Sequence, residues 1–69
     1  MSARKKLIHD LALTTSYRYS EIDKAFRLFQ HTNLSYNDIH NLVKIAIICA
    51  QTINKNELLH MCLLFTKVI

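Results

Sequence analysis

Histidine and cysteine are the residues of this chain that could support a metal site. The chain holds His9, His31, His40, His60, Cys49 and Cys62. Zinc sites usually show paired ligands such as C-x-x-C or H-x-x-x-H, and neither spacing occurs here. His60 and Cys62 stand two positions apart, which places them on different sides of a helix. The spacing therefore predicts no metal site and no cofactor.

Catalytic groups are also scarce in this sequence. A nucleophilic cysteine needs an exposed thiolate with a base within reach, whereas Cys49 and Cys62 both lie in apolar runs. Glu21 and Asp23 fit the start of a helix, where the helix dipole favours acidic side chains. A glycine-rich phosphate loop is excluded because the chain has no glycine. We predict no catalytic residues and a protein that is not an enzyme.

Residues 17–27 combine aromatic and basic side chains. Such a mixture is typical of protein interfaces. Our first hypothesis places a partner-binding site on Tyr17, Arg18, Tyr19, Lys24 and Arg27. The competing interpretation packs Tyr17 and Tyr19 over a helix pair, with their hydroxyl groups in water.

The charge of the chain leaves nucleic-acid binding open. Nine Lys and Arg against five Asp and Glu give a net charge of +4. A phosphate-contacting surface could use Arg4, Lys5, Lys6, Arg18 and Arg27. This alternative is a basic, dimeric DNA-binding transcriptional regulator of the helix-turn-helix type, with Asn33 or Asn37 replacing the glycine that such turns often contain. Charge that only keeps the surface soluble explains the same balance.

The length and composition favour a single all-α domain over residues 1–69. Sheet folds with tight turns depend on glycine, proline or Asn-Gly pairs, and glycine and proline are absent. The basic N-terminus precedes an apolar stretch that His9 and Asp10 interrupt before it reaches signal-peptide length. The longest apolar run, residues 45–50, is far shorter than the roughly 20 residues that span a bilayer. We expect a cytoplasmic protein without a membrane span, and a membrane-surface role for the first helix is a further alternative.

Serine and asparagine must delimit the helices, since the usual helix breakers are missing. Ser20 and Ser35 are each followed three positions later by an aspartate, as in a capping box, and Asn54 or Asn56 is a third N-cap candidate. These signals predict a bundle of about four helices over residues 4–14, 21–31, 36–52 and 57–68. A β-strand over residues 42–50, which are rich in β-branched side chains, is the competing prediction.

Two of the expected helices are apolar on more than one side. In the third, one stripe holds Ile39, Leu42, Val43, Ala46, Ala50 and Ile53, and a second, displaced stripe holds Ile45, Ile48 and Cys49. In the fourth, Leu58, Met61, Cys62, Phe65 and Ile69 form one face, and Leu59, Leu63 and Leu64 lie off it. Apolar residues make up 18 of the 28 residues from 42 to 69, against 17 of the first 41.

This excess of apolar surface predicts self-association. A chain of this size buries only about 60 % of its unfolded surface, too little to cover two helices on every side. We expect a homodimer through the two C-terminal helices, with Ile45, Ile48, Cys49, Leu59, Leu63 and Leu64 at its interface. The function expected is that of a small regulator, adaptor or inhibitor acting by protein–protein contact. A phage- or plasmid-encoded inhibitor of a host factor is a further alternative.

The segment from residue 20 to residue 69 also carries a family resemblance. The run Asn33-Leu34-Ser35, the later Asp38-Ile39, the pair Ile47-Ile48 and the run Ile53-Asn54-Lys55-Asn56-Glu57-Leu58-Leu59 resemble the small enterobacterial connector proteins of the AriR/YmgA/YcgZ type. The resemblance implies an all-helical homodimer that regulates biofilm or acid-resistance programmes through two-component signalling. No binding residues are carried over from it.

Overall fold

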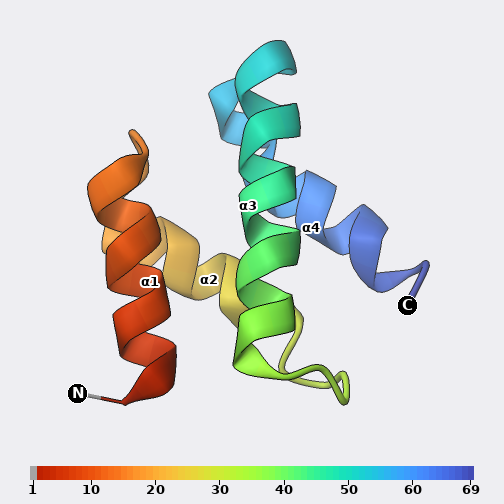
Figure 1. Cartoon of the computed structure of the whole chain (residues 1–69). Helices are drawn as coiled ribbons and strands as arrows, with labels where there is room; N and C mark the ends of the chain where they lie inside the picture. Colours follow the sequence, from red (N-terminus) through yellow and green to blue (C-terminus); the bar gives the residue numbers. More distant parts are fainter. Residues whose placement is uncertain (1) are drawn as a thin grey trace.

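The chain forms four α-helices joined by short connectors (Figure 1). The computed structural model describes residues 2–69, with α1 (Ala3–Thr14), α2 (Tyr19–Leu28), α3 (Tyr36–Ile53), the 3-10 turn η1 (Lys55–Glu57) and α4 (Leu58–Thr66). In the view of Figure 1, α1 and α3 stand side by side, while α2 and α4 cross behind them. The prediction of an all-α fold is confirmed. The competing strand over residues 42–50 is wrong, because this segment lies inside α3.

Side-chain caps explain where α3 and η1 begin. The Ser35 hydroxyl accepts a hydrogen bond from the backbone N–H of Asp38 at 3.2 Å, as its position predicts. The side-chain oxygen of Asn54 accepts one from the N–H of Asn56 at 2.9 Å, so Asn54 is the cap of the two candidates.

The predicted cap of α2 at Ser20 is wrong. The helix begins two residues earlier than expected, at Tyr19, and Arg18 is its N-cap residue. The Glu21 carboxylate reaches back and accepts the N–H of Arg18 at 2.9 Å. Glu21 is longer than aspartate and reaches this amide, which leaves Asp23 available for other contacts.

One apolar core joins all four helices. Its fully buried side chains include Ile8 of α1, Phe26 of α2, Val43 of α3 and Cys62 of α4. The apolar stripe formed by Ile22, Ala25, Phe26 and Phe29 is buried, and each of these side chains is at most 1 % exposed.

One expectation about burial needs correction. Ile53 was expected on the buried stripe of α3 but is 68 % exposed, because the helix ends there and the chain turns away into η1. In α1, Ile8 and Leu11 are buried in the core, whereas Leu13 is 73 % exposed. Within residues 2–69, none of the helices combines the length and hydropathy needed to cross a bilayer.

Candidate interaction surfaces

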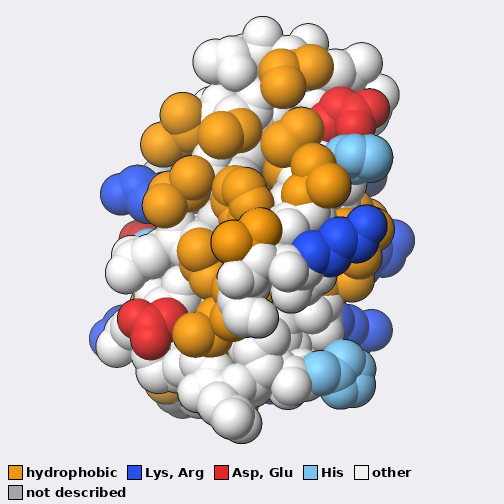
Figure 2. Space-filling model, turned by 90° about the vertical axis from the view of Figure 1, so that its right-hand side faces the viewer, with side chains coloured by type: hydrophobic (Ala, Val, Ile, Leu, Met, Phe, Trp, Pro, Cys, Tyr) orange, Lys and Arg blue, Asp and Glu red, His pale blue; other side chains and the backbone are white. Residues whose placement is uncertain are grey.

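The side of the molecule formed by α3 and α4 exposes a group of apolar side chains. We call Ile45, Ile48, Cys49, Leu59, Leu63 and Leu64 the α3–α4 face. Its five aliphatic side chains are 39–55 % exposed, and Cys49 is half-buried. Figure 2 shows apolar side chains gathered across this side of the molecule, with charged groups mainly toward its edges. The structure thus confirms that a single chain leaves these residues uncovered.

Helix geometry explains why this face stays uncovered. The core-facing side of α3 carries Ile39, Val43, Ala46 and Ala50, and that of α4 carries Leu58 and Cys62. A helix can turn only one side toward the core of so small a domain. The second apolar stripe of α3 and the off-face leucines of α4 therefore point outward. Ile48 also lines a groove of about 320 Å³ between α1 and α3, beside His40 and Lys44.

Tyr17 takes a different place from the one predicted. It was expected among the partner-binding residues, but it is 3 % exposed and belongs to the core. Its hydroxyl donates a hydrogen bond to the carbonyl oxygen of Lys55 at 2.7 Å, so it is not in water either. Burial raises the pKa of Tyr17 above its ordinary value of 10.0, with further contributions from the nearby Glu21 and Cys62.

Lys55 completes this contact between the α1–α2 connector and η1. Its ammonium nitrogen donates to the carbonyl oxygen of Ser16 at 2.9 Å and lies 5.4 Å from the centre of the Tyr17 ring. Lys55 is not among the site residues predicted from the sequence. The partners are 38 and 39 positions apart, and no local pattern signals such a contact.

Arg4 is less available to phosphate groups than the nucleic-acid alternative requires, whereas the Arg27 side chain is 66 % exposed. Arg4 pairs with the Asp23 carboxylate at 2.7 Å and Arg27 pairs with its other oxygen at 3.0 Å. The Arg4 side chain is only 19 % exposed and lies 5.9 Å from the centre of the Phe26 ring. The expectation that Arg4 belongs to an open basic cluster is therefore corrected. Lys5 and Lys6 of that cluster are exposed.

The remaining predicted partner-binding residues lie on one helix and its approach. Arg18, Tyr19, Lys24 and Arg27 are all exposed, and Tyr19 is 38 % exposed. Of these, Lys24 also lines a small groove between α2 and the start of α4.

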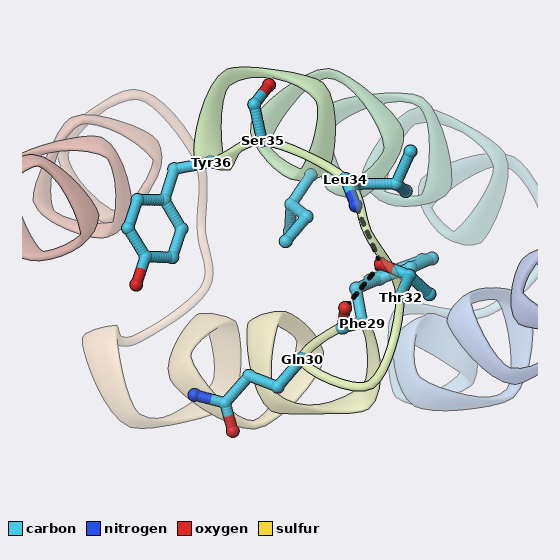
Figure 3. A pocket seen from close by; sticks show the side chains of 7 residues that line it. Phe29, Gln30, Thr32, Leu34, Ser35 and Tyr36 are labelled. Carbon is cyan, nitrogen blue, oxygen red and sulfur yellow. Dashed lines mark hydrogen bonds between the residues drawn. The ribbon is translucent and has the colours of Figure 1, made fainter.

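A larger hollow of about 580 Å³ lies at the α2–α3 connector (Figure 3). There the Thr32 hydroxyl donates to the carbonyl oxygen of Phe29 at 2.6 Å and accepts the N–H of Leu34 at 3.4 Å. Gln30 and Tyr36 supply the other large polar side chains, and no carboxylate, amine, imidazole or thiol lines the hollow. The hydroxyl groups of Thr32, Ser35 and Tyr36 line the hollow without a carboxylate, amine or imidazole beside them that could act as their base.

The histidines and cysteines do not assemble into a site. Across residues 2–69, no three His, Cys, Asp or Glu side chains come together as metal ligands would. His40 contacts Asp10 at 3.5 Å, and His60 contacts Glu57 at 4.0 Å. Cys62 is fully buried, and burial raises the pKa of its thiol from 9.0 to about 12, which opposes formation of a thiolate.

Comparisons with known proteins add no further guide to the function. No protein-family model, no curated protein sequence and no solved structure matches this chain. The resemblance to the connector proteins therefore stays a prediction.

Proposed function

We propose that this chain is a small non-enzymatic regulatory or adaptor protein that acts as a helical homodimer through protein–protein contacts. The exposed α3–α4 face is the observation that carries the proposal. Single exposed aliphatic side chains are common on protein surfaces, whereas a gathered group of them is typical of an interaction site.

Burial of the α3–α4 face favours association. Complete burial of an aliphatic side chain contributes about 1.5–3 kcal/mol, so covering the exposed half of five such side chains contributes about 4–7 kcal/mol per subunit. Association costs ~4–15 kcal/mol in lost freedom, which is of the same size as the gain for two subunits. We therefore expect a weak dimer whose population depends on protein concentration rather than an obligate one.

A second copy is a suitable occupant because the face is uncharged. None of its six residues is Lys, Arg, Asp or Glu, so two copies can meet across a two-fold axis without burying like charges. A charged partner would gain little from such a surface.

The test is sedimentation of purified protein across a concentration series. The wild-type chain should change from monomer to dimer as concentration rises, and Ile48→Glu should remain monomeric because dimerisation would bury an unpaired carboxylate. Leu13→Glu is the matched control, since Leu13 is 73 % exposed on α1 and lies outside the face. Circular dichroism should show the same helix content in all three proteins.

Two results would contradict the proposal. One is a wild-type chain that stays a folded monomer at high concentration. The other is an equal loss of dimer in Ile48→Glu and Leu13→Glu. Because Ile48 is 55 % exposed in the single chain, its replacement should not unfold the monomer.

The DNA-binding alternative has less support from the described residues. Arg4 is held by Asp23 with its side chain only 19 % exposed, and residues 29–35 between α2 and α3 exceed the three or four residues of a helix-turn-helix turn. Duplex DNA binding that weakens steeply as salt rises would favour that alternative instead.

A further inference from the structure

A narrow groove lies between α2 and the start of α4. It is lined by Tyr17, Glu21, Lys24, Lys55, Asn56, Leu58 and Leu59. Its volume is about 180 Å³, below the roughly 300–1,000 Å³ of typical small-molecule sites. A groove of this size suits one side chain of a partner protein better than a whole ligand.

Lys55 is a pre-positioned cation at this groove. An ammonium group has three donors, and the carbonyl oxygen of Ser16 accepts one of them. The same ammonium is held 5.4 Å from the centre of the Tyr17 ring. A lysine on a surface normally loses rotamer freedom when it binds, but this one is already fixed by two contacts. Its remaining donors are available to an acceptor at little further entropic cost.

The second cation of the groove is Lys24. It is exposed on α2 and makes no ion pair within the described residues 2–69. The one acidic group in the lining is Glu21, whose carboxylate already accepts the N–H of Arg18 at 2.9 Å. Lys24, Lys55 and Glu21 together give the lining of the groove a net positive charge.

The N-terminal part of the chain carries a net charge of the same sign. Residues 3–28, which include α1 and α2, contain six Lys or Arg and three Asp or Glu, a difference of +3 out of the total of +4. A net positive charge attracts acidic groups of a partner.

We propose that the α2–α4 groove binds an aspartate or glutamate side chain of a partner protein. The carboxylate accepts hydrogen bonds from Lys55 and Lys24, which both line the groove and lie outside the α3–α4 face. This inference names the chemistry of the partner and so rests on the proposed function of protein–protein contact.

The test titrates isotope-labelled full-length chain with two short peptides and follows backbone amide shifts. One peptide alternates leucine and glutamate, and its matched control alternates leucine and glutamine. The glutamate peptide should shift the amides of the groove and the glutamine peptide should not. Lys24→Gln and Lys55→Gln should each weaken binding by about fivefold, the effect of one partly exposed ion pair. Lys5→Gln makes the same charge change on α1 and should leave the affinity unchanged.

Three outcomes would overturn the inference. They are equal binding of the two peptides, equal weakening by Lys5→Gln, and duplex DNA that binds the same residues more tightly than the peptide at the same salt. Repeating the titration on Ile48→Glu separates this inference from the proposed dimer. Peptide binding by a monomer supports the groove even if sedimentation of the wild-type chain contradicts dimerisation.

Discussion

At the residue scale, Tyr17 and Asp23 connect parts of the chain that are distant in sequence. The Tyr17 hydroxyl joins the α1–α2 connector to Lys55, and Asp23 accepts from Arg4 of α1 and Arg27 of its own helix. Both residues are polar, but their main contacts hold elements of the fold together. Of the five residues predicted to bind a partner, Arg18, Tyr19, Lys24 and Arg27 are exposed and Tyr17 is buried.

Replacing Tyr17 by phenylalanine tests the contact with Lys55. The ring remains in the core, but the hydrogen bond at 2.7 Å is lost, so the free energy of unfolding should fall by about 1 kcal/mol. Urea unfolding measures the change. Tyr19→Phe is the control, because Tyr19 is exposed and its change should stay within about 0.5 kcal/mol of zero. Equal effects of the two substitutions would contradict the assigned role.

Alkaline pH should destabilise the fold through Cys62 and Tyr17. Burial raises the pKa of Cys62 from 9.0 to about 12 and raises that of Tyr17 above 10.0. Above pH 9 the unfolded chain therefore loses protons that the folded chain still holds, and the free energy of unfolding falls as pH rises. Urea unfolding between pH 7 and pH 11 should show a level region and then a decline that begins near pH 9. In Cys62→Ala the decline should begin nearer pH 10, and an unchanged profile would contradict this assignment.

At the element scale, the helix starts show which local signals are reliable. Ser35 caps α3 where the sequence predicts, because the Leu34 and Ile39 that flank the box fix the entry of the chain. Ser20 has the same spacing to an aspartate but lies inside α2, where Glu21 caps Arg18 instead. The carboxylates of Glu21 and Asp23 are both close enough in sequence to cap the start of α2. The longer Glu21 side chain is the one that reaches a free backbone N–H, that of Arg18.

Alanine substitutions at the two serines test this distinction. Ser35→Ala should lower the free energy of unfolding by about 1 kcal/mol, the usual contribution of an N-cap side chain. Ser20→Ala should leave stability unchanged or raise it by a few tenths of a kcal/mol, since alanine is the better helix former. Thermal or urea unfolding measures both. A larger loss of stability in Ser20→Ala than in Ser35→Ala would contradict this distinction and favour Ser20 as the cap of α2.

At the scale of the whole molecule, charge and apolar surface are separated. Residues 3–28 carry most of the positive charge, and the α3–α4 face carries the exposed aliphatic side chains. Dimerisation through that face leaves α1 and much of α2 available to a partner. The groove beside Leu59 lies at the border between the two surfaces.

Salt should act in opposite directions on the two surfaces. Each subunit carries a net charge of +4, so screening reduces the repulsion between copies and should strengthen the dimer. The same screening should weaken binding of the acidic peptide. Sedimentation and peptide titration at about 0.05 M and 0.5 M salt measure both effects, since the screening length falls from about 14 Å to about 4 Å between these concentrations. A dimer that weakens as salt rises would indicate an interface held by ion pairs rather than by the α3–α4 face.

The sequence by itself determined the helical class, the approximate position of all four helices and the surplus of apolar surface on α3 and α4. These properties follow from local rules, because helix periodicity sets which side chains share a face and a capping side chain acts within three residues. Ile45, Ile48, Leu59, Leu63 and Leu64 were identified in this way, and each is exposed in the single chain.

Only the tertiary structure decided the roles of Tyr17, Lys55 and Arg4. Their partners are Lys55, Ser16 and Asp23, which lie 38, 39 and 19 positions away along the chain. Such contacts depend on how α1 and α2 pack against the rest of the fold, and no spacing within one helix encodes that packing. The α2–α4 groove exists for the same reason, since its two lysines come from elements that meet only when the chain is folded.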